Sequence, residues 1–245
     1  MRRTFHPARA VALIVARMDT PGLPGRPLLP LGGTTVLEQV LRRVQAARCV
    51  THCVVATTDR EVDRPLRDFC AHQRVHCCAH PEGDPVSIGL AVAHGFGVGA
   101  VALCDDSQPL MSSGMLEACV RYAVDAGMDY VTVKPMPEGT VPEVISVRAL
   151  TRLASVREDT GYDGRVSEWL ALYPEWFESA CLPAPIRLRS PDVRLVLETQ
   201  SDYQQLAEIF LQVPPNSEGL VALEDVLDCL EDRRVAHAAS ALRAA

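Results

Sequence analysis

Short runs of apolar residues alternate along the chain with longer segments in which apolar residues recur every three or four positions. The short runs are typical of buried strands, and the longer segments are typical of amphipathic helices. Strands are predicted over residues 10–16, 52–56, 75–78, 98–103, 130–133 and 193–197. This alternation indicates an α/β fold with a Rossmann-like, mostly parallel sheet flanked by helices.

Helical segments lie between and after these strands. Helices are predicted over residues 36–44, 64–71, 87–94, 115–124, 148–156, 166–172, 203–211 and 223–230. Ser112 or Ser113 is expected to cap the helix at 115–124. The sequence Thr199-Gln200-Ser201-Asp202 predicts a capping box before the helix that contains Tyr203.

The segment from residue 135 to residue 190 has a less regular pattern than the rest of the chain. One strand-like run, at residues 143–145, predicts a small antiparallel extension of the sheet. We expect a single domain over residues 1–245, in which residues 135–190 form this extension or a dimerisation subregion.

Composition and charge narrow the range of partners. The chain has 245 residues, 31 acidic against 24 basic residues, a formal net charge of -7, and 5% aromatic residues. This composition favours neither neutralisation of a phosphate backbone nor base stacking, so we expect no nucleic-acid partner. No apolar run approaches the roughly 20 residues that cross a bilayer, so we expect no membrane span. Nine cysteines scattered among apolar runs indicate a reducing, cytoplasmic location without disulfides.

A loop rich in glycine and proline follows the first predicted strand. It reads ARMDTPGLPGR from Ala16 to Arg26 and carries an arginine near each end. Glycines let backbone N–H groups approach phosphate oxygens, and arginine supplies a permanently charged fork, so the loop is a candidate phosphate cradle. The same composition also suits an ordinary turn, and the loop is neither a Walker A loop nor GxGxxG.

Two adjacent carboxylates, Asp105 and Asp106, follow the predicted strand at 98–103. The carboxyl edge of an open α/β sheet is where such folds bind ligands, so these residues are candidate functional groups. A polar strand terminus is the alternative interpretation.

Five segments, in this order, resemble the spore-coat-polysaccharide-F-like cytidylyltransferases, relatives of the CMP-sugar-acid synthetases. They are LIVARMDTPGLPGRPLLPLGG, VVATTDREVDRPLRDFC, DDSQPL, VPEVISVRAL and VRLVLETQSDY, and the resemblance covers roughly residues 10 to 230. It implies a nucleotide-diphospho-sugar transferase type of fold and a homodimer. It also implies transfer of CMP from CTP to a small anionic acceptor in polysaccharide biosynthesis, with release of pyrophosphate. The acceptor would be a sugar acid, a sugar phosphate or a phosphonate.

The resemblance also implies roles for individual residues. Arg17, Arg26 and Asp106 would be catalytic, and Asp106 and Glu198 would hold Mg²⁺. Glu143 and Arg165 would bind the acceptor. The nucleotide would be bound by Ala16, Arg17, Met18, Thr20, Gly25, Arg26, Thr57, Thr58 and Asp59.

Several positions depart from the pattern of the family, so that the active-site motifs are degenerate. Asp19 stands where glycine is usual, Gly22 and Ile88 stand where arginine is usual, and Glu198 replaces aspartate. A carboxylate in a triphosphate cradle repels phosphate, and loss of an arginine removes charge-assisted hydrogen bonds. These departures keep a second hypothesis open, in which the chain is a catalytically degenerate relative that serves as a nucleotide-binding or scaffolding subunit.

A cluster of cysteine and histidine residues supports a third, weaker alternative, in which the chain is a metal protein that binds Zn²⁺ through these side chains. The cluster contains Cys70, His72, His76, Cys77, Cys78 and His80. These are ligands that Zn²⁺ prefers, but their spacing matches no standard zinc finger. Core cysteines with exposed histidines are the simpler interpretation.

Overall fold

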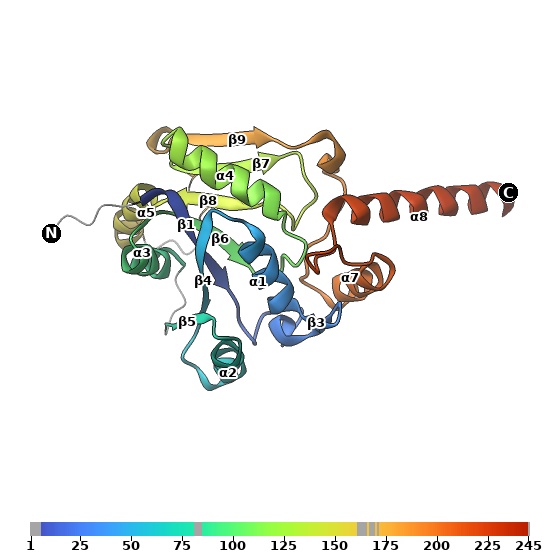
Figure 1. The fold of residues 1–245 in the computed structure, drawn as a ribbon, viewed down its shortest axis with the longest axis horizontal. Helices are drawn as coiled ribbons and strands as arrows, with labels where there is room; N and C mark the ends of the chain where they lie inside the picture. The colour runs from blue at the N-terminus through green and yellow to red at the C-terminus, as the bar shows by residue number, and fades with distance from the viewer. Residues whose placement is uncertain (1–5, 81–84, 161–165, 167–169, 171, 245) are drawn as a thin grey trace.

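A seven-stranded sheet forms the centre of the computed structural model, which describes residues 6–80, 85–160, 166, 170 and 172–244 (Figure 1). Its strands are β1 (His6–Val15), β4 (Val50–Thr57), β5 (His76–Ala79), β6 (Val98–Asp105), β7 (Tyr130–Lys134), β8 (Glu143–Ser146) and β9 (Ser179–Pro183). They are ordered β5-β4-β1-β6-β8-β7-β9. All neighbouring pairs are parallel except those of β8, which is antiparallel to both β6 and β7. The predicted mostly parallel α/β sheet is confirmed.

Helices cover both faces of this sheet, as its alternating residues require. They are α1 (Val36–Ala46), α2 (Arg64–Gln73), α3 (Pro85–Phe96), α4 (Ser113–Asp125), α5 (Val147–Thr160), α7 (Gln200–Gln212) and α8 (Leu223–Ala244). On β1, Ala12 and Ile14 pack into the core shared with α1 and α4, whereas Val11 and Leu13 pack into the core shared with α3 and α5. A strand buried on both faces is a continuous apolar run, which explains the uninterrupted apolar sequence of β1 from Ala10 to Val15.

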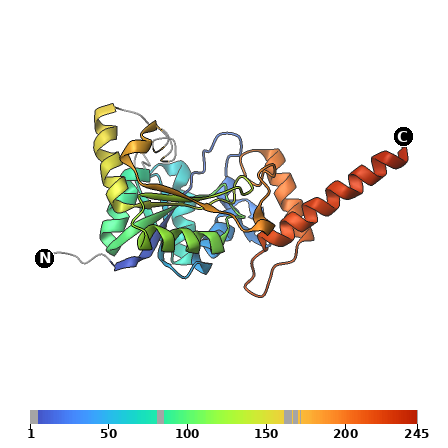
Figure 2. The ribbon, with the colours of Figure 1, turned by 90° about the horizontal axis from the view of Figure 1, so that it is seen from above.

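Local signals place the beginnings of α4 and α7 close to where the sequence predicts them, whereas α8 continues to Ala244, beyond the predicted end at residue 230. The side chain of Ser112 accepts a hydrogen bond from the Met115 backbone N–H, at 3.3 Å, and thereby caps α4. Thr199 and Asp202 form the predicted capping box of α7. The helix predicted at 166–172 falls largely outside the described residues. Figure 2 shows α8 extending away from the sheet, and no helix among the described residues is long and apolar enough to span a bilayer.

The predicted strand at 193–197 is wrong. This segment is extended, but it forms only an isolated bridge between Arg194 and Glu138. Its backbone bonds to loops instead, because Leu195 donates to the Glu138 carbonyl and Leu197 donates to the Ser107 carbonyl, each at 2.8 Å. The edge position beside β7 is occupied by β9, which the sequence pattern did not reveal.

The antiparallel part of the fold is built into the main sheet. The strand predicted at 143–145 is β8, and it lies between β6 and β7. A separate small hairpin, β2 (Pro30–Leu31) with β3 (Thr34–Thr35), follows the first loop. The short 3₁₀ helices are η1 (Arg26–Leu28), η2 (Glu61–Asp63), η3 (Pro174–Trp176) and η4 (Ile186–Leu188).

Candidate active site

Two adjoining cavities open at the carboxyl ends of β1 and β6, where the sheet is expected to bind a ligand. The first, the loop cavity, has a volume of about 450 Å³ and is lined by Val15, Ala16, Arg17, Asp19, Thr20, Pro21, Arg26, Asp105 and Asp106. The second, the acidic cavity, has a volume of about 210 Å³, and its lining includes Asp105, Glu138, Glu143 and Glu198. Val15 and Asp105 line both cavities. Parts of the chain that are far apart in sequence therefore meet at one edge of the sheet.

A buried ion pair between Arg26 and Asp106 lies at the floor of the loop cavity. Arg26 is 6% exposed and Asp106 is 0% exposed. Arg26 donates to Asp106 Oδ1, to the Leu197 carbonyl at 3.1 Å and to Asp105 Oδ1 at 3.3 Å. Its guanidinium thus joins the loop after β1 to the carboxyl end of β6 and to the segment before α7.

The second oxygen of Asp106, Oδ2, is buried and has no hydrogen-bond partner among the described residues. Burial, and with it the charge of Asp105, raises the pKa of Asp106 to about 8, although the ion pair with Arg26 opposes the rise. A buried carboxylate with one oxygen unsatisfied is costly, and such a group is typical of functional sites.

Asp63 holds the loop of the cavity in place. It is fully buried. Its Oδ1 accepts the Met18 backbone N–H at 2.7 Å, and its Oδ2 accepts the Thr58 hydroxyl. Gly25 then closes the loop by donating its N–H to the Met18 carbonyl at 2.8 Å. No sequence signal singles out Asp63, because a carboxylate before an α-helix suits a helix entry equally well.

Asp19, whose carboxylate would repel phosphate if it were alone, has two guanidinium partners. Arg17 contacts both of its oxygens, at 3.0 and 3.2 Å, and Arg60 donates to Oδ2 at 2.6 Å. Hydrogen bonds from Arg17 and then from Arg60 lower the pKa of Asp19 below its ordinary value. The two arginines offset the repulsion of phosphate by this carboxylate.

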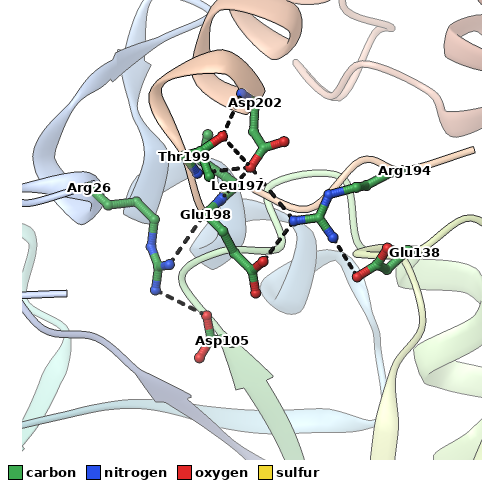
Figure 3. A network of polar contacts seen from close by, with 8 residues as sticks. All are labelled: Arg26, Asp105, Glu138, Arg194, Leu197, Glu198, Thr199 and Asp202. Atoms are coloured by element: carbon green, nitrogen blue, oxygen red, sulfur yellow. Dashed lines mark hydrogen bonds and ion pairs between the residues drawn. The ribbon is translucent and has the colours of Figure 1, made fainter. Parts of the chain in front are cut away.

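Glu198 lies at the junction of a second ionic network, which Figure 3 shows. Arg194 contacts Glu138 at 2.6 Å, Glu198 at 2.7 Å and Asp202 at 3.6 Å. The Glu198 backbone N–H donates to Asp202 Oδ2 at 3.0 Å, which ties it to the cap of α7. In Figure 3, Arg26 and Asp105 lie on one side of Glu198, and Arg194 and Glu138 lie on the other.

The structure gathers most of the predicted site residues but not all of them. The loop cavity contains Ala16, Arg17, Thr20, Arg26 and Asp106, and the acidic cavity contains Glu143 and Glu198. Met18 and Gly25 contribute their backbones to the same loop. Thr57 and Thr58, at the carboxyl end of β4, are buried, and Asp59 is exposed. Arg165 lies outside the described residues.

The cysteine and histidine cluster near β5 does not form a metal site in the part of the chain that the structure describes, where no three His, Cys, Asp or Glu side chains are grouped to hold an ion. The nine cysteines are free thiols. His52 and His76 instead pack against Phe96, with ring centroids 4.1 and 5.2 Å from it.

Gly22 lets the loop approach the segment that carries Glu198. It has φ +85°, and a Cβ there would lie 2.7 Å from the Glu198 carbonyl oxygen. Gly22→Ala is therefore expected to lower the free energy of unfolding by about 2 to 3 kcal/mol, through backbone strain and this contact. Urea denaturation measures the change. An arginine at position 22, the residue that the resemblance to the family implies there, would meet the same obstacle.

Gly33 is the matched control for Gly22, because it has φ +81° and a Cβ there would meet nothing within 4 Å. Gly33→Ala is expected to cost only the conformational part, about 1 kcal/mol. Equal losses in the two variants would show that the contact with Glu198 does not constrain the loop.

Comparisons with known proteins agree with this fold. The family model for cytidylyltransferases matches residues 11–162. The Bacillus subtilis spore coat polysaccharide biosynthesis protein SpsF is 25% identical over 203 residues, which cover 81% of this chain and 85% of SpsF.

Two solved structures have similar folds. A cytidylyltransferase from Leptospira borgpetersenii has a TM-score of 0.81 and 20% identity, and the match covers 93% of this chain and 95% of that one. A CMP:2-keto-3-deoxy-manno-octonic acid synthetase in complex with CTP has a TM-score of 0.61 and 14% identity, covering 83% of this chain and 99% of the other.

The fold is that of an α/β protein with charged cavities at the carboxyl edge of its sheet. The match of the family model to more than half of the sequence identifies it further: this chain belongs to the cytidylyltransferase family.

Proposed function

We propose that this protein transfers CMP from CTP to a small acceptor, with release of pyrophosphate. The observation that carries the proposal is the buried Arg26–Asp106 pair, which leaves Asp106 Oδ2 unsatisfied beside a cavity that also holds Arg17. SpsF is named for polysaccharide biosynthesis, and the structurally similar synthetase is bound to CTP. These relatives support a nucleotide in the loop cavity and a sugar-derived acceptor in the acidic cavity.

The residues present fit a divalent cation. Mg²⁺ prefers carboxylate oxygens, and Asp106 Oδ2 is a buried carboxylate oxygen with no hydrogen-bond partner among the described residues. Asp106 would hold the ion, and Glu198, on the adjoining cavity, would be its second protein ligand. The ion would neutralise the charge that develops on the phosphate oxygens.

In the proposed reaction an acceptor oxygen attacks the α-phosphorus of CTP. A new P–O bond forms, the bond to the β-phosphate breaks, and pyrophosphate leaves with the electron pair. Arg17 would bind the phosphates of the leaving group, while Arg26 holds Asp106 in position and excludes water from the floor of the cavity. The contact of Asp63 with the Met18 N–H fixes the backbone of the loop at that residue.

We propose a small anionic acceptor: a sugar acid, a sugar phosphate or a phosphonate. The acidic cavity carries carboxylates from Asp105, Glu138, Glu143 and Glu198. An anionic acceptor is attracted there only if cations offset these charges, so bound Mg²⁺ and Arg194 would have to contribute. The dependence of acceptor binding on Mg²⁺ is part of the test.

The test is release of pyrophosphate from CTP, ATP, GTP or UTP with Mg²⁺ and a panel of sugar acids, sugar phosphates and phosphonates. Release that requires CTP, Mg²⁺ and one acceptor class is the expected result. If no pyrophosphate is released across the panel, but CTP with Mg²⁺ stabilises the protein in a thermal-shift titration, the result would favour a catalytically degenerate, nucleotide-binding subunit instead. If there is neither release of pyrophosphate nor stabilisation by CTP with Mg²⁺, nucleotide chemistry at this site would be rejected.

A further inference from the structure

Arg60 brings a guanidinium to Asp19, a residue that lines the loop cavity, from a different part of the chain. It lies between β4 and η2, and its Nη1 is 2.6 Å from Asp19 Oδ2. The Arg60 carbonyl accepts a hydrogen bond from Arg67 at 2.9 Å, and its N–H donates to the Thr58 hydroxyl at 3.3 Å. Its backbone is therefore fixed, while its side chain is 49% exposed.

The charges that line the loop cavity do not suit a polyphosphate by themselves. When every lining carboxylate is counted as ionised, Arg17 and Arg26 supply two positive charges, and Asp19, Asp105 and Asp106 supply three negative charges, a sum of −1. The guanidinium of Arg26 is moreover engaged by Asp105, Asp106 and the Leu197 carbonyl. Among the described residues that line this cavity, Arg17 is thus the one cation with substantial exposure, at 44%. A polyphosphate anion needs at least one further cation from the protein.

We propose that Arg60 is a phosphate-binding residue of this site, held beside Arg17 by Asp19 and transferred from Asp19 to phosphate oxygens when nucleotide or pyrophosphate binds. This inference rests on the proposed function. Adding Arg60 brings the local charge to zero before Mg²⁺ enters. Asp19 keeps two guanidinium forks close together at the mouth of the cavity, which reduces the entropy lost when they close on phosphate.

The exchange of partners at Asp19 involves two exposed side chains, Arg17 at 44% and Arg60 at 49% exposure. Both contacts of Asp19 are partly exposed, and exposed ion pairs contribute little to stability, so phosphate competes with Asp19 at small cost. Phosphate also accepts the two parallel hydrogen bonds that a guanidinium offers. Arg60 therefore supplies from a neighbouring loop the cation that position 22, a glycine, does not provide.

The first experiment measures the dissociation constant of inorganic pyrophosphate with Mg²⁺ by calorimetry. Arg60→Gln is expected to raise it about tenfold, because one charge-assisted contact is lost. Arg64→Gln is the matched control: Arg64 begins α2 nearby, is 64% exposed and pairs only locally, with Glu61 at 3.1 Å and Asp68 at 3.8 Å. Its dissociation constant is expected to stay within about twofold of wild type. Equal dissociation constants of pyrophosphate for Arg60→Gln and Arg64→Gln would overturn the inference.

A double-mutant cycle separates a phosphate contact from a merely structural role. If Arg60 acts only by neutralising Asp19, then Arg60→Gln with Asp19→Asn will bind pyrophosphate as tightly as Asp19→Asn alone, and the inference fails. If Arg60 binds phosphate itself, the double variant will remain about tenfold weaker than Asp19→Asn. Thermal unfolding of each variant checks that the fold is intact.

The outcomes for Arg60 and for the proposed function are distinguishable. Arg60-dependent binding of pyrophosphate without turnover of CTP supports the phosphate-binding residue and rejects the activity. If wild type turns over CTP and Arg60→Gln has the same rate and the same KM, the role of Arg60 in phosphate binding is rejected and the proposed activity is supported. Absence of both pyrophosphate binding and turnover rejects both.

Discussion

Asp106→Asn is expected to lower the rate of CMP transfer about 10²- to 10³-fold while the protein stays folded. Asparagine keeps the shape of the side chain and an oxygen that can accept the hydrogen bond from Arg26. It removes the negative charge that would hold the divalent cation at Oδ2. Steady-state release of pyrophosphate, measured at several Mg²⁺ concentrations, gives the size of the effect.

Asp125→Asn is the control for this substitution, because Asp125 is an exposed carboxylate at the end of α4, away from both cavities. Its rate is expected to match wild type. A rate close to wild type for Asp106→Asn would mean that this carboxylate has no part in the reaction, and the proposed cation site would have to be abandoned.

Arg26→Met is expected to lower the free energy of unfolding by about 3 kcal/mol, because removing one partner of a buried ion pair leaves the other charge uncompensated. It also releases the Leu197 carbonyl from the loop. Chemical denaturation with urea at neutral pH measures the loss. The fall in stability should be accompanied by loss of nucleotide binding, since Asp106 is no longer held in place.

The double variant with Arg26→Met and Asp106→Leu tests the origin of that loss. Replacing both charged partners with apolar groups of similar size is expected to recover most of the stability, although the variant will be inactive. A double variant as unstable as Arg26→Met alone would show that the Leu197 contact, and not the ion pair, holds the site together.

Local patterns predicted much of the fold. The apolar run of β1, the cap at Ser112 and the capping box at Thr199 and Asp202 are set by neighbouring residues, so the sequence alone carries their signals. The same reasoning failed at residues 193–197. An extended, apolar segment was interpreted as a strand, but its hydrogen-bond partners are the loops at Glu138 and Ser107. Periodicity shows that a segment is extended and does not show what it pairs with.

The predictions for the site were limited by long-range contacts. The loop glycines and the carboxylates after β6 were visible because they follow predicted strands. The pairing of Arg26 with Asp106 spans 80 residues, that of Arg60 with Asp19 spans 41, and that of Asp63 with Met18 spans 45. No spacing rule joins such positions. From the sequence alone, Asp19 is therefore an isolated negative charge, whereas the structure pairs it with the guanidinium groups of Arg17 and Arg60.

The main chain around Glu198 is fixed by contacts that do not involve its carboxylate. Leu197 is bound through its carbonyl to Arg26 and through its N–H to Ser107, and the Glu198 N–H is bound to Asp202. A shorter or neutral side chain at position 198 would keep this scaffold. Directed evolution aimed at a different cation, such as Mn²⁺ in place of Mg²⁺, can therefore begin with this single codon and leave the backbone framework untouched.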